Sequence, residues 1–131
     1  MKIALGSDHG GFEMKEEVAS LLATLKHEFN DIGCFSKDSV DYPEIAQKVC
    51  SHVREGTAQC GILICGTGIG MSIAANRQRE IRAALCHEAY TARMSREHNN
   101  ANVLCLGGRV LGIEVALDIV RVWLTTSFAG G

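Results

Sequence analysis

The sequence predicts an α/β protein with a three-layer, Rossmann-like fold, in which a five-stranded parallel sheet carries helices on both faces. Short apolar runs and longer helix-like stretches alternate five times along the 131 residues. The apolar runs do not alternate with polar residues, which is typical of strands buried on both sides. The length suits one core, so residues 1–131 are expected to form a single domain.

Each element has a local signal. Strands are predicted at 2–6, 28–32, 61–65, 82–86 and 102–106, of which the second is the least apolar. Helices are predicted at 12–26, 41–55, from 70 to 76, at 88–98 and at 111–126. The first helix has Val18 and Leu22 one turn apart, the second has Pro43 in its first turn, and the last has Val115 and Ile119 on one face. A polar loop, 33–40, follows the second strand.

Composition excludes several functional classes. The net charge of −2 argues against nucleic acid as the main partner, since that requires a basic face. No apolar run approaches the roughly 18 residues of a membrane span, and the N-terminal run from Met1 to Gly6 is too short for a signal peptide. The six cysteines lack the spacing of zinc sites, so we expect no metal and a reduced, cytoplasmic protein.

The segment around Cys65 predicts an activated thiol. An apolar run ends at Cys65, a glycine-rich turn follows, and a helix is expected from Gly70. The start of a helix carries roughly half a positive charge and free amides that bind anions. Such a site favours the thiolate, and a base beside an anion cradle is what enolate chemistry requires. The alternative is that Cys65 is only a buried cysteine at the end of a strand, before a tight turn.

Three other segments contain candidate site residues. Asp8 and His9 follow the first strand, although Asp8 is also placed to cap the first helix. Arg109 follows the last strand, where it either holds a phosphate or is simply exposed. His98 and Asn99 end the fourth helix, which puts them at the opposite edge of the sheet, so a second subunit would have to bring them to the site.

These motifs together resemble the type B ribose-5-phosphate isomerases, a family that includes galactose-6-phosphate and allose-6-phosphate isomerases. The sequences SDHGGF (7–12), DYP (41–43), ICGTGIG (64–70), SIAAN (72–76), SREHN (95–99) and NVL (102–104) carry the resemblance in order and spacing. It covers almost the whole chain. The activity it implies interconverts ribose 5-phosphate and ribulose 5-phosphate through a cis-enediolate, in a homodimer or tetramer, without a cofactor.

The resemblance also implies roles. Cys65 is the base that removes the C2 proton, Asp8 and His98 open the sugar ring, and Thr67 passes protons between the two oxygens. The anion hole comprises Gly66, Thr67, Gly68, Ile69 and Gly70. His9 and Arg109 help to hold the phosphate, and Asn99 contacts the sugar. His98, Asn99 and Arg109 are expected to come from a partner subunit.

At the C-terminal end the sequence departs from the family pattern. The family usually continues beyond this point with a basic tail, on which two arginines bind the phosphate. The sequence ends at Gly131 without them. If the protein lacks such a tail, we expect weaker phosphate affinity.

Several alternatives remain open. The substrate could be a six-carbon sugar phosphate, because no residue reports the size of the pocket. Asp31 lies at the end of the second strand, where dinucleotide-binding folds place a carboxylate, although G-x-G-x-x-G is absent from the first loop. Cys65 could instead serve a hydrolase or redox protein, although Cys60, five positions away, is not an adjacent resolving cysteine. A non-catalytic isomerase subunit would not need Cys65, Asp8 and His98.

Overall fold

The computed structural model describes residues 1–34 and 41–130, so most of the predicted loop 33–40 lies outside the described residues. The strands are β1 (Lys2–Ser7), β2 (Glu28–Gly33), β3 (Cys60–Cys65), β4 (Ala83–Leu85) and β5 (Val103–Gly107). The helices are α1 (Phe12–Thr24), α2 (Tyr42–Glu55), α3 (Ile69–Asn76), α4 (Ala89–Glu97) and α5 (Ile113–Thr125), with a 3₁₀ turn η1 (His9–Gly11) before α1. No helix of the described part is long and apolar enough to cross a membrane.

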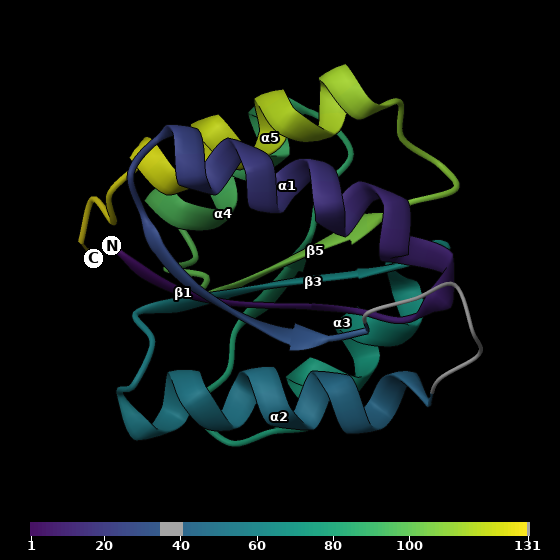
Figure 1. Ribbon diagram of the computed structural model, residues 1–131. Helices are drawn as coiled ribbons and strands as arrows, with labels where there is room; N and C mark the ends of the chain where they lie inside the picture. Colours follow the sequence, from purple (N-terminus) through teal and green to yellow (C-terminus); the bar gives the residue numbers. More distant parts are fainter. Residues whose placement is uncertain (35–40, 131) are drawn as a thin grey trace.

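The predicted three-layer architecture is confirmed. All described strand pairings are parallel, and the strand order is β2-β1-β3-β5-β4. Helices α1, α4 and α5 cover one face of the sheet, and α2 and α3 cover the other (Figure 1). Trp123 is fully buried on the first face and Met71 on the second. Each such large apolar side chain contributes roughly 1.5–3 kcal/mol through burial.

The element boundaries differ from the predictions in two informative places. Helix α1 ends at Thr24 rather than at residue 26, because Lys26 adopts a left-handed φ of 63°. Strand β4 is shorter than predicted because it lies at the edge of the sheet. The Asn76 side chain bonds both the N–H and the C=O of Ala83 there, at 2.9 and 3.0 Å, and takes the place of a neighbouring strand.

The strand order determines where a site can form. β1 and β3 are neighbours although β2 lies between them in the chain, so the connections leave β1 and β3 in opposite directions across the sheet. Ligands of open parallel sheets bind at such a switch point, beyond the carboxyl ends of the strands. The loops that begin at Asp8 and Cys65 lie at this point.

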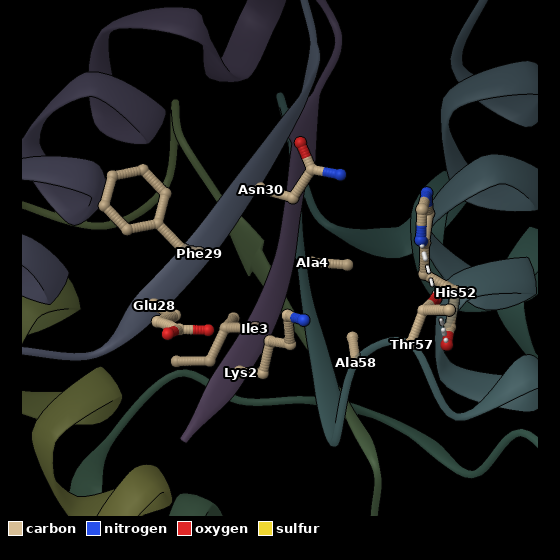
Figure 2. A pocket seen from close by; sticks show the side chains of 9 residues that line it. All are labelled: Lys2, Ile3, Ala4, Glu28, Phe29, Asn30, His52, Thr57 and Ala58. Atoms are coloured by element: carbon tan, nitrogen blue, oxygen red, sulfur yellow. Dashed lines mark hydrogen bonds between the residues drawn. The ribbon is translucent and has the colours of Figure 1, made fainter.

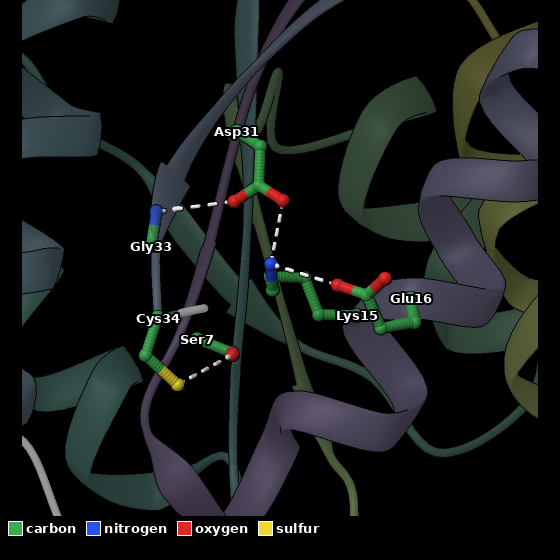
Figure 3. A network of polar contacts seen from close by, with 6 residues as sticks. All are labelled: Ser7, Lys15, Glu16, Asp31, Gly33 and Cys34. Atoms are coloured by element: carbon green, nitrogen blue, oxygen red, sulfur yellow. Dashed lines mark hydrogen bonds and ion pairs between the residues drawn. The ribbon is translucent and has the colours of Figure 1, made fainter. Parts of the chain in front are cut away.

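An ion pair between a buried lysine and a partly exposed aspartate joins α1 to β2. Lys15 is fully buried, and its Nζ contacts Asp31 Oδ2 at 2.5 Å, while Asp31 Oδ1 accepts a hydrogen bond from the N–H of Gly33 (Figure 3). The exposed Glu16 contacts the same ammonium at 3.2 Å. Asp31, the carboxylate of the dinucleotide alternative, is therefore engaged by structural contacts.

We predict that Asp31→Asn lowers the free energy of unfolding by about 1–3 kcal/mol, because it removes the charge of the carboxylate that lies nearest to a buried ammonium. Urea titration followed by circular dichroism measures this loss. Glu16→Gln is the matched control, since it removes an exposed partner of the same ammonium and should cost about 1 kcal/mol or less. Equal losses for the two variants would show that the contact between Lys15 and Asp31 contributes no more to stability than the contact between Lys15 and Glu16.

Candidate active site

Cys65 ends β3, and its thiol faces the start of α3. The side chain is only 6% exposed, and its Sγ accepts a hydrogen bond from the N–H of Gly68 at 3.2 Å. Helix α3 begins at Ile69, whose N–H bonds the Thr67 hydroxyl oxygen at 3.1 Å. The Cys65 sulfur thus lies at a helix start, where backbone N–H groups point toward it.

The backbone conformation of this turn requires glycine at position 68. Gly68 has a φ of +81°, in the left-handed region. A Cβ at this position would also lie 2.5 Å from Leu85 Cδ1 and 3.0 Å from the carbonyl carbon of Leu106. Conformation and close packing therefore both hold the N–H of Gly68 toward the thiol.

Asp8 caps the 3₁₀ turn η1 and not helix α1, whose N-cap is Gly11, so the predicted cap of the first helix is displaced to the turn before it. Its Oδ1 accepts hydrogen bonds from the N–H groups of Gly10 at 2.9 Å and Gly11 at 3.2 Å. Its backbone N–H donates to the carbonyl of Ile64 at 3.1 Å. This bond fixes the first loop against the end of β3, beside Cys65. The cap does not test the predicted ring-opening role of Asp8.

A pocket of about 280 Å³ lies between the loops that follow β1 and β5. Its lining residues are His9, Gly10, Glu13, Met14, Gly108, Arg109 and Ile113. Within the described residues, Nδ1 of His9 is buried and has no hydrogen-bond partner. Imidazole and guanidinium donors on one small pocket suit an anion such as a phosphate. Sequence reasoning missed Gly108 and Ile113, although the Gly-Gly pair after β5 signals a close backbone approach.

The placement of Arg109 differs from the prediction. The resemblance implies that a partner subunit supplies it, but here it lies beside the Cys65 loop of its own chain. Its N–H donates to the carbonyl of Gly66 at 2.9 Å, and its Cδ lies 3.4 Å from where a Cβ of Gly66 would be. The reason is the register, because Cys65 pairs with Gly107 and the two strands end together.

His98 and Asn99 lie at the other edge of the sheet, as predicted. His98 caps the carboxyl end of α4, and both side chains are exposed. The strand β5, which begins just after this segment and ends beside Cys65, advances about 13 Å over four residue steps. The chain by itself therefore does not bring His98 to Cys65.

The other two asparagines of this segment have structural functions. Asn100 adopts a left-handed φ of 50°, a conformation that asparagine tolerates. The Asn102 side chain accepts the N–H of Arg82 at 2.8 Å and donates to the carbonyl of Glu80 at 3.0 Å. Asn102 therefore holds the connection before β4 in place.

Four of the other cysteines have raised pKa values. Burial raises the pKa of the Cys50 and Cys60 thiols to about 11, and it also raises the pKa of Cys86 and Cys105. These four thiols stay protonated near neutral pH. No disulfide joins cysteines in the described part of the chain, and no three His, Cys, Asp or Glu side chains there gather as metal ligands.

A second pocket lies far from these residues. It measures about 430 Å³ and opens at the amino ends of β1 and β2 (Figure 2). His52 and Thr57, whose side chains hydrogen-bond at 2.8 Å, lie on its wall toward α2, and Glu28 and Asn30 lie on the opposite wall. It contains none of the predicted site residues.

Comparison with known proteins agrees with this geometry. The family model described as Ribose/Galactose Isomerase matches residues 3–131. The chain belongs to the ribose/galactose isomerase family. It is 48% identical to ribose-5-phosphate isomerase B of Escherichia coli, over 99% of this chain and 87% of that protein. It is 39% identical to a D-erythrulose-4-phosphate isomerase of Pectobacterium atrosepticum, over 100% of this chain and 87% of that protein.

Solved structures of this isomerase family have the same fold. Ribose-5-phosphate isomerase B of Clostridium thermocellum superposes with a TM-score of 0.99 at 53% identity, covering 100% of this chain and 88% of that one. The type B enzyme of Trypanosoma brucei gives 0.95 at 46% identity, with coverage of 99% and 89%. The resemblance stated from the sequence motifs is confirmed.

We predict that Gly68→Ala destabilises the protein by about 2–4 kcal/mol, because strain in the left-handed region adds to overpacking against Leu85. Gly56→Ala is the matched control, since Gly56 has a φ of +80° but nothing lies within 4 Å of its missing Cβ. It should cost about 1–2 kcal/mol from strain alone. Urea unfolding measures both values, and equal losses would show that the turn around Cys65 is loosely packed.

Proposed function

We propose that this chain is an aldose–ketose isomerase that interconverts ribose 5-phosphate and ribulose 5-phosphate, with residues 1–131 acting as one sugar-phosphate isomerase domain. The observation that carries the proposal is Cys65, with its Sγ 3.2 Å from the N–H of Gly68, one loop away from the pocket of His9 and Arg109. The names of the Escherichia coli and Clostridium thermocellum relatives support ribose 5-phosphate as the substrate.

In this mechanism Cys65 removes the proton from C2 of the open-chain aldose. The electrons move onto the C1 oxygen, and the Cys65 thiol then returns the proton to C1 of the resulting cis-enediolate. Backbone N–H groups between Gly66 and Gly70 stabilise the oxygen that becomes negative, at about 3–4 kcal/mol for each well-placed donor. Thr67 passes a proton between the two oxygens. The reaction requires no cofactor, since a thiol and fixed dipoles supply its chemistry.

Binding of the phosphate and opening of the ring complete the proposal. His9 and Arg109 bind the phosphate, and the buried unpartnered Nδ1 of His9 among the described residues supports this. Asp8 and His98 exchange protons with the ring oxygen and the C1 hydroxyl, and Asn99 contacts the open sugar. The Asp8 carboxylate is fixed by backbone N–H groups in a loop that is bonded to the end of β3, which supports this assignment.

The site is proposed to be shared between two subunits of a homodimer, or of a tetramer built from such pairs. The separation of His98 from Cys65 in one chain supports this. Large apolar side chains are also exposed next to the site, on α3 and around the start of α5: Ile69, Ile73, Val110, Ile113 and Val115. Such side chains suit a contact between copies.

We place the protein in the reducing cytoplasm, because it has six cysteines and no disulfide in its described part.

We predict that Cys65→Ser lowers kcat for ribose 5-phosphate by at least about 100-fold, because a hydroxyl is a far weaker base than a thiolate. A coupled assay of ribulose 5-phosphate formation measures the loss. Cys60→Ser is the matched control at the opposite end of the same strand and should retain activity. Turnover of Cys65→Ser within tenfold of the parent enzyme would contradict the assignment of the base.

The same assay with allose 6-phosphate and galactose 6-phosphate tests the six-carbon alternative.

We predict that two inactive variants restore each other. When Cys65→Ser and His98→Asn chains are co-expressed and assemble at random into dimers, half of the dimers hold both variants, and one of their two sites is intact. Activity should then reach about a quarter of that of the parent, as two-fold symmetry requires. Each variant purified alone is the control. Activity no higher than the sum of the two would contradict a site shared between subunits.

A further inference from the structure

We propose that Arg96 is a positioning residue, which fixes the segment from His98 to Ala101 so that His98 and Asn99 reach the partner's site in the correct orientation. This inference rests on the proposed function, because it assigns Arg96 to the half of the machinery that one chain supplies to another. Arg96 itself does not contact the substrate in this account.

The Arg96 side chain connects three segments. Its guanidinium lies 4.7 Å from the centre of the Trp123 ring, which is fully buried in α5. Its Nε donates to the carbonyl of Thr126 at 3.2 Å, beyond the end of α5, and its NH1 donates to the carbonyl of Ala101 at 2.5 Å. Only a planar side chain with several fixed donors can stack on the ring and reach both carbonyls.

The neighbours of Arg96 strengthen this connection. The Trp123 indole N–H donates to the Ser95 hydroxyl at 3.1 Å, and the N–H of Ala101 donates to the carbonyl of Ser95 at 2.9 Å. The carbonyl of Glu97 accepts the N–H of Ala129 at 3.1 Å. Ser95, Arg96 and Glu97 are thus each bonded to another segment, whereas the next two residues, His98 and Asn99, are exposed.

Residues 95–97 are thus held by contacts with other segments, directly before the two exposed side chains that are proposed to act in the partner's site. His98 lies at the end of a helix, where backbone hydrogen bonds alone allow fraying. The contacts of Arg96 fix the loop that follows the helix, because the guanidinium stacks on the Trp123 ring and bonds the carbonyl of Ala101. A misplacement of about 1 Å at a catalytic group can cost on the order of 100-fold in rate, so loss of this support should appear in kcat.

Arg93 offers a matched control on the same helix. Its guanidinium also lies over an aromatic ring, at 5.6 Å from the centre of Tyr90, but both side chains are exposed. We expect Arg96→Gln to lower kcat by about 10–100-fold, and Arg93→Gln to leave it unchanged. Arg96→Gln should also increase the hydrogen-exchange rates of the amides of 98–101, measured by mass spectrometry, without affecting those of β3. Arg96→Lys takes its place if the glutamine variant does not fold.

Co-expression decides how Arg96 acts. We expect Arg96→Gln to regain activity when paired with Cys65→Ser, because the intact site then takes Cys65 from one chain and an undisturbed His98 from the other. Paired with His98→Asn, it should regain none. The opposite pattern, or unchanged exchange at 98–101, would overturn the proposal. The hydrogen-exchange measurement does not depend on isomerase activity. It therefore tests the support by Arg96 even if the proposed function is wrong.

Discussion

The parallel sheet imposes the constraint on which this site depends, because it brings the carboxyl ends of its strands to one edge. Backbone hydrogen bonds then join the loops that leave those ends. The N–H of Asp8 bonds the carbonyl of Ile64 at 3.1 Å, and the N–H of Gly108 bonds that of Cys65 at 2.8 Å. Main-chain bonds therefore hold together the loops that carry the Cys65 thiol, the Asp8 carboxylate and the His9–Arg109 pocket.

The same constraint excludes His98 from the site of its own chain. A helix that packs antiparallel to the strands must end at their amino edge, and α4 ends there with His98 as its cap. The geometry of the fold thus divides the proposed chemistry into two halves. Cys65 and Asp8 follow strand ends. His98, the second residue proposed for ring opening, lies at a helix end that Arg96 and Trp123 support.

The sequence predicted those parts of the structure that depend on local pattern. Apolar runs identified the five strands, and the Cys65 turn was recognised from its position between a strand and a helix. Features that depend on register or on long-range pairing were not predictable in this way. Arg109 was assigned to a partner because the pairing of Cys65 with Gly107 cannot be read from the chain. The Lys15–Asp31 pair joins residues 16 positions apart on different elements, and no spacing rule reveals it.

A thiol of one chain and an imidazole of another are proposed to act on the same sugar. A crystal structure of the enzyme with an enediolate analogue of ribose 5-phosphate tests it most directly. We expect Cys65 Sγ of one subunit and the His98 imidazole of a second subunit both to contact the analogue, with its phosphate between His9 and Arg109. An analogue bound at Cys65 with no His98 near it, or bound away from Cys65, would contradict a site shared in this way.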